Sequence, residues 1–216
     1  NTFRSVGTRL SHFIYKKFGN QKLETDTICI GLKGSAGQSL GAFLTKGLKL
    51  TVEGDCNDYV GKGLCGGSIV VRPSSKSKLK SNENTIIGNT VLYGATAGKL
   101  FASGQAGERF AVRNSGSLAI IEGCGAHGCE YMTGGTAIIL GSVGDNFGAG
   151  MTGGMAFVYD KENKFENYAN PNSIIWQPVE TNYWKEYLKE NLKQFFKETN
   201  SEITEKILSN FDKELE

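Results

Sequence analysis

The sequence predicts a mainly β fold: a β-solenoid with one helix at the N-terminus and two helices at the C-terminus. Three observations support this prediction. Glycine accounts for 29 of the 216 residues, and all but Gly7 and Gly19 lie between Gly31 and Gly154. Within that region, short apolar segments separated by glycine recur at a fixed period, and outside it the apolar residues follow helical spacing. A fixed period of short strands is typical of a coil whose successive turns stack on one another.

Residues 1–20 are predicted to form a helix. Val6, Leu10, Phe13 and Ile14 recur at the spacing of one helical face, and Gly19 can end the helix. We expect this helix to pack on one end of the core, and together with its lead-in it occupies residues 1–26.

The predicted solenoid covers residues 27–160, and its turns are about 19 residues long. Six strands each directly follow a glycine, and the positions of successive glycines differ by 20, 31, 18, 19 and 19. The long step contains a polar segment of 12 residues at 73–84, predicted to be a solvated loop, and without it that step is also 19. The six glycines are Gly47, Gly67, Gly98, Gly116, Gly135 and Gly154.

A second glycine series, Gly104, Gly123 and Gly141, closes the same strands. All nine glycines are predicted to be structural, because sharp corners require backbone conformations that other residues adopt at a cost. Between the main strands, segments 91–93 and 109–112 are apolar enough to predict further strands. Each turn of the solenoid should therefore contribute two or three faces around an apolar interior.

Residues 161–216 contain no glycine and are predicted to form a linker and two amphipathic helices, the second capped by Ser201 after a break at 199–201. We expect both helices to pack on the solenoid and cap its exposed edge strands. Their apolar faces comprise Trp184, Leu188, Leu192 and Phe195, and then Ile203, Ile207, Leu208, Phe211 and Leu215.

Composition excludes several classes of protein. A formal net charge of +2 gives no sign of nucleic-acid binding, and no apolar run is long enough to cross a membrane. The first residues lack the apolar core of a signal peptide, and a chain that begins with Asn rather than Met is expected to be processed or excised from a longer one. We expect a soluble, intracellular protein, cytoplasmic or organellar. Five cysteines without a C-x-x-C pair predict reduced, mostly buried thiols.

Two segments contain residue types that bind metals or phosphate. Residues 124–129 include Cys124, His127 and Cys129, but the spacing is not a standard zinc pattern, and His127 has no identifiable partner that would make it a base for either thiol. The segments 104–107 and 61–63 resemble phosphate loops, yet neither opens a helix in a dinucleotide motif. Packing at solenoid corners is the favoured interpretation of these segments, and we predict no catalytic, cofactor-binding or metal-binding residue in the chain.

The most informative polar group is Glu108, Arg109, Arg113 and Asn114. Charges that recur on one face of a solenoid are possible contacts with a neighbouring domain, and a solvated face is the alternative interpretation.

Long runs of the sequence resemble the C-terminal domain of the glutamate synthase large subunit, a family whose domain is built on a Gly-x-Gly-x-Gly repeat. The similarity extends to the helical tail and covers nearly the whole chain, departing mainly at 73–84 and 161–181. The runs are LKGSAGQS at 32–39, GDCNDYVGKG at 54–63, the segment 88–116, EG at 122–123, GCEYMTGG at 128–135 and NFGAGMTGG at 146–154.

The resemblance implies a right-handed, single-stranded β-helix that braces the amidotransferase and FMN-binding synthase domains of the same polypeptide. Such a parent oxidoreductase makes glutamate from glutamine and 2-oxoglutarate, as part of nitrogen metabolism, with FMN, an iron-sulfur cluster and a reduced electron donor. No segment of this chain matches the motifs for those groups, so the resemblance implies a non-catalytic scaffold without cofactors of its own. Two alternatives remain: an independent β-helix subunit of another redox complex, like those of formylmethanofuran dehydrogenase, and a small enzyme with an active site on a solenoid face.

Overall fold

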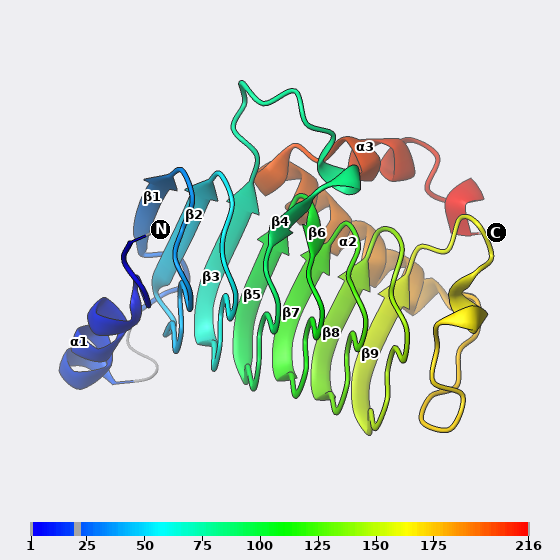
Figure 1. Cartoon of the computed structure of the whole chain (residues 1–216), viewed down its shortest axis with the longest axis horizontal. Helices are drawn as coiled ribbons and strands as arrows, with labels where there is room; N and C mark the ends of the chain where they lie inside the picture. Colours follow the sequence, from blue (N-terminus) through cyan, green and yellow to red (C-terminus); the bar gives the residue numbers. More distant parts are fainter. Residues whose placement is uncertain (1, 20–22, 216) are drawn as a thin grey trace.

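The computed structural model describes residues 2–19 and 23–215 and shows a β-solenoid flanked by helices (Figure 1). Seven parallel strands stack in the order β1-β2-β3-β5-β7-β8-β9, and two short strands, β4 and β6, form a second sheet. The main strands are β1 (Ile28–Lys33), β2 (Leu48–Glu53), β3 (Cys65–Arg72), β5 (Ala97–Ala102), β7 (Ser115–Ile121), β8 (Thr133–Ile139) and β9 (Gly153–Val158), and the short ones are β4 (Thr85–Ile87) and β6 (Gln105–Ala106). The predicted mainly β solenoid and its repeat period are therefore confirmed.

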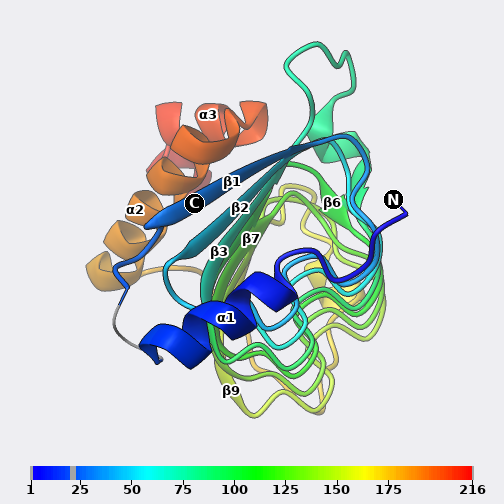
Figure 2. The ribbon, with the colours of Figure 1, turned by 90° about the vertical axis from the view of Figure 1, so that its left-hand side faces the viewer.

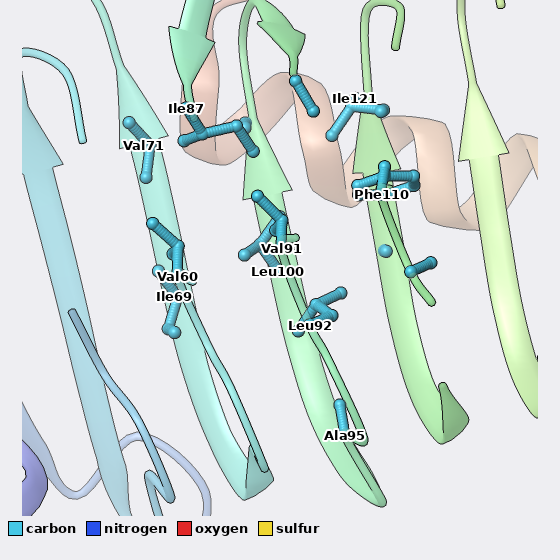
Figure 3. Close-up of a cluster of buried hydrophobic side chains, with 14 of the residues drawn as sticks. Val60, Ile69, Val71, Ile87, Val91, Leu92, Ala95, Leu100, Phe110 and Ile121 are labelled. Carbon is cyan, nitrogen blue, oxygen red and sulfur yellow. The ribbon is translucent and has the colours of Figure 1, made fainter. Parts of the chain in front are cut away.

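Strand register places like residues on like residues from one turn to the next. Leu50 pairs with Ile69, and Ile69 pairs with Leu100. These side chains are fully buried inside the solenoid, where Val91 and Phe110 from the opposite wall also point (Figure 3). Because side chains alternate along a strand, every other residue of the same strands faces outward. The main core thus lies inside the coil, and a second apolar surface lies outside it.

Glycine permits turns to approach more closely than a side chain would allow. A Cβ on Gly116 would lie 2.1 Å from the carbonyl oxygen of Thr96 in the preceding turn. Six glycines were predicted to precede strands. Gly47 does precede β2, whereas the other five, Gly116 among them, lie within the first three residues of their strands. Gly104, Gly123 and Gly141 follow their strands by two residues. The polar segment after β3 projects from the solenoid and returns through a short 3-10 helix, η1 (Ser81–Glu83), to β4 (Figure 1).

The two C-terminal helices cover the outer face of the seven-stranded sheet. Helix α2 (Asn182–Thr199) and helix α3 (Glu202–Ser209) were predicted, as was the capping of α3 by Ser201, whose Oγ accepts a hydrogen bond from the backbone N–H of Thr204 at 3.2 Å. Phe195 packs edge-on against Phe101 of β5, with ring centroids 5.6 Å apart. The expectation that these helices cap the edge strands is wrong, because the apolar surface that needs cover is the outward face of the sheet.

Helix α1 (Thr8–Phe18) lies across one end of the coil (Figure 2) and buries Ile14 in the main core, as predicted. It is shorter than the predicted 1–20. Gly19 ends it, whereas Thr2–Gly7 are not helical, and Asn1 and Asn20 lie outside the described residues. Two further 3-10 helices, η2 (Phe165–Asn167) and η3 (Lys213–Leu215), complete the C-terminal part. Among the helices in residues 2–19 and 23–215, none is both long and apolar enough to cross a bilayer.

Candidate interaction surface

One wall of the solenoid is built from consecutive turns rather than from strands. We call it the turn wall and define it as the six stacked segments 39–43, 59–63, 90–94, 109–113, 127–131 and 146–150. In each segment the first, third and fifth residues have φ between 53° and 72°, in the left-handed region. The predicted strands at 91–93 and 109–112 are therefore wrong. Apolar side chains in these segments point into the core, as they would in a strand. However, Leu92, Arg109 and Ala111 have φ near +60°, which lies outside the β region.

Backbone hydrogen bonds hold the turn wall together from one turn of the solenoid to the next. In segment 109–113, the N–H of Arg109 donates to Ala126 in the following turn at 2.8 Å, and that of Ala111 donates to Val91 in the preceding turn at 2.9 Å. The N–H of Arg113 again donates forward, to Glu130 at 3.0 Å. Each turn is thus bonded to both neighbours, so the wall is rigid although its residues are not extended.

The middle residue of each segment faces inward, and the first and fifth residues face outward. Leu92, Ala111 and Cys129 occupy middle positions and are fully buried. At the fifth position, Phe43 and Tyr131 are each 54% exposed. The outer face of the turn wall therefore presents large aromatic side chains to the surroundings.

The four residues predicted as interdomain contacts divide into three that are exposed and one that is buried. Glu108, Arg109 and Arg113 are exposed at or beside the turn wall. Within the described residues, neither arginine side chain donates a hydrogen bond or forms an ion pair. Asn114 is fully buried, and its Oδ1 accepts hydrogen bonds from the backbone N–H (2.9 Å) and the hydroxyl (2.8 Å) of Ser117. Asn114 thus shapes the corner into β7, while the two arginine side chains are exposed.

The segment with metal-ligand residue types does not bring its three side chains together. Cys124 and Cys129 face the core, where burial raises the pKa of the Cys124 thiol to about 12 and that of Cys129 well above its usual value. His127 lies on the outer face, with Nδ1 3.2 Å from Asn146 Nδ2 and 3.7 Å from Glu130 Oε1. In the part of the chain that the structure describes, no three His, Cys, Asp or Glu side chains cluster as metal ligands.

The two segments resembling phosphate loops are also part of the solenoid frame. Residues 61–63 belong to the turn wall, and residues 104–107 form a corner that includes β6. Neither segment leads into a helix, so neither presents the helix N-terminus that binds phosphate in dinucleotide sites.

Sequence reasoning missed a buried carboxylate that joins three parts of the molecule. Glu122, only 1% exposed, follows β7, and its Oε1 accepts hydrogen bonds from Ser103 Oγ (3.0 Å) and from Ser201 Oγ at the start of α3 (2.6 Å). Its Oε2 has no hydrogen-bond partner within the described residues. Burial raises the pKa of Glu122, and the hydroxyl groups of Ser201, Ser81 and Ser103 oppose that rise.

Glu122 also borders a cleft of about 350 Å³ between the last solenoid turns, η1 and α3. Asn82 and Ile203 form part of its rim. The pairing of Glu122 with Ser201 spans 79 residues, so no local sequence signal could have revealed it.

The sequence was compared with known families and curated proteins. The family model described as the GXGXG motif matches residues 1–216. The chain belongs to the GXGXG family.

Curated relatives of this GXGXG chain are glutamate synthases. It is 59% identical over 215 residues to "Glutamate synthase [NADPH] large chain" of Azospirillum brasilense and 50% identical to "Glutamate synthase [NADH]" of Schizosaccharomyces pombe, with 100% of the chain covered in both cases. It is 46% identical to "Glutamate synthase [NADPH] large chain" of Bacillus subtilis, and that match covers 98% of the present chain. The chain spans only 10–14% of the length of these relatives. These matches do not favour an independent redox-complex subunit.

Proposed function

We propose that this chain is a non-catalytic scaffold domain of a glutamate synthase, holding the catalytic domains of the same polypeptide in place. The observation that carries the proposal is the match of the whole chain to a 10–14% portion of much longer glutamate synthases. A stacked solenoid suits this role, because its interlocked turns form a rigid body. The proposed partners are the amidotransferase and FMN-binding synthase domains.

In this proposal the parent enzyme transfers nitrogen from glutamine to 2-oxoglutarate, and FMN and an iron-sulfur cluster are bound outside this chain. The cysteines here do not fit a cluster, whose iron is held by converging thiolates. Burial raises the pKa of both Cys56 and Cys124 to about 12, which favours protonated thiols, and the sulfurs of Cys29 and Cys65 bond to separate backbone carbonyls. We therefore assign the chain's residues no step in the reaction.

The test is glutamine-dependent glutamate formation by a large chain lacking this domain, with and without the 216-residue chain added separately. The scaffold proposal expects the truncated large chain to be inactive or unstable. Restoration of activity by the added chain would show that the domain acts through contacts. Full activity and full stability without the domain would contradict the proposal. Glutamate formation by the isolated chain alone would instead support the small-enzyme alternative.

A further inference from the structure

The fifth position of the turn wall carries bulky residues where glycine would fit the backbone better. Six residues stack in this column: Phe43, Gly63, Gly94, Arg113, Tyr131 and Gly150. All six have positive φ, between 53° and 65°, yet three of them are Phe, Arg and Tyr. A side chain in this region is strained, and such strain persists only where the surrounding structure fixes the backbone.

Contacts within the chain explain only part of this choice. The Phe43 ring lies over Gly63 and the Tyr131 ring lies over Gly150, so each aromatic covers the glycine of the next turn. Even so, both rings remain 54% exposed. Arg113 forms no ion pair or hydrogen bond through its side chain among the described residues. No polar contact of the Arg113 side chain within the described chain therefore offsets the backbone strain at this residue.

The composition of this surface is that of a protein interface. Tyrosine, phenylalanine and arginine are enriched at interfaces and supply much of their binding free energy. Here Tyr131 lies one turn after Arg113 and Phe43 lies three turns before it, with Arg109 at the first position of the same segment as Arg113. At about 4.8 Å per turn, Phe43 and Tyr131 lie roughly 19 Å apart, which suits one continuous patch.

We infer that the column of Phe43, Arg113 and Tyr131, with Arg109 beside it, is the line along which the rest of the same polypeptide docks. This inference rests on the proposed scaffold function and specifies its surface. Since the chain spans 10–14% of its glutamate synthase relatives, 86–90% of such a polypeptide lies outside it and is covalently tethered to it. The two arginines form no ion pair within the described residues, and a partner surface that presents carboxylates would suit them, because guanidinium groups bind carboxylates in bidentate fashion.

Site-specific photo-crosslinking in the full-length large chain tests this inference. A photoreactive phenylalanine analogue replaces Tyr131, and in a matched protein it replaces Ser142, an exposed residue at the corner after β8. We expect position 131 to crosslink to a peptide of the same chain outside residues 1–216, and position 142 to give at least ten-fold less of that product. Crosslinks from position 131 only within residues 1–216, no crosslink at all, or equal yields from both positions would overturn the inference.

Mixing isotopically heavy and light copies identifies the occupant. Light-to-light and heavy-to-heavy products support docking within one polypeptide, whereas mixed products would show that a second copy covers the column and would overturn the inference. Failure here is distinguishable from failure of the scaffold proposal. If the truncated enzyme needs this domain but position 131 does not crosslink, the scaffold stands and the docking line is wrong. If the truncated enzyme is fully active, the scaffold itself is wrong.

Discussion

Two walls of the same solenoid differ in backbone conformation and in how far the rest of the chain covers them. The seven-stranded sheet, here called the strand wall, buries apolar residues on its inner face, and its outward apolar residues, such as Phe101 and Ile120, are covered by α2 and α3. The turn wall lies on the other side of the coil (Figure 2) and leaves Phe43, Arg113 and Tyr131 exposed. A single repeating unit therefore builds one surface that the chain covers itself and another that it leaves exposed.

The largest effect is expected on the strand wall, where Phe195→Ala removes a fully buried ring that packs on Phe101. Truncating a buried phenylalanine leaves a cavity, so the free energy of unfolding should fall by about 3–5 kcal/mol. Urea unfolding followed by circular dichroism measures this loss. Tyr183→Ala, on the same helix but 69% exposed, is the control and should change stability by about 0.5 kcal/mol or less. Equal losses in the two variants would mean that α2 is not bound to the sheet as described.

A pH dependence is expected at the junction between the strand wall and α3. Burial raises the pKa of Glu122 in the folded chain, and Glu202 contributes in the same direction. A carboxyl with a raised pKa contributes stability below its unfolded-state pKa of about 4.3, and that contribution is lost as pH rises through the folded-state pKa. The wild-type chain should therefore lose stability relative to Glu122→Gln as the pH rises from the unfolded-state pKa through the folded-state pKa of Glu122. Superimposable pH profiles of unfolding free energy for the two proteins would refute this assignment.

The smallest effect is expected on the turn wall, and it has the opposite sign. Arg113→Gly relieves a positive φ of 55° and removes a side chain without polar partners in the described chain. Relief of about 1–2 kcal/mol, reduced by the greater flexibility of glycine in the unfolded state, should leave a net stabilisation of roughly 0.5–1 kcal/mol. Lys33→Gly is the control: Lys33 is exposed in a strand, without positive φ, and lies 3.6 Å from Glu53, so glycine there should destabilise by roughly 0.5–1 kcal/mol through the backbone, with a small further loss from this exposed ion pair. Thermal unfolding distinguishes the two signs, and a loss of stability in both variants would show that Arg113 is not strained.

Much of the strand wall could be predicted from the sequence, because glycine spacing and apolar alternation are local signals. The terminal helices were predictable for the same reason, through the spacing of residues such as Leu188 and Leu192. The turn wall was not, because Val91 and Leu92 have the composition of a strand, and nothing local indicates that Leu92 adopts φ of 60°.

Long-range and tertiary features were likewise hidden. The sequence placed Asn114 on the surface beside Arg113. Its side chain is instead buried and hydrogen-bonds to Ser117 at the corner into β7. The link between Glu122 and Ser201 joins residues that only folding brings together. Exposure of Arg109 and Arg113 agrees with the expected surface position, and their role as contacts stays a prediction.

The most direct test of the claim that the turn wall is a docking surface is charge reversal in the full-length enzyme. Arg109→Glu with Arg113→Glu changes two exposed side chains that make no internal polar contact in the described chain, and Lys76→Glu with Lys78→Glu makes the same charge change on the projecting loop. We expect glutamine-dependent glutamate formation to fall at least ten-fold in the first variant and to stay within two-fold of wild type in the second. Unchanged activity in the arginine variant, with the domain still folded, would contradict the claim.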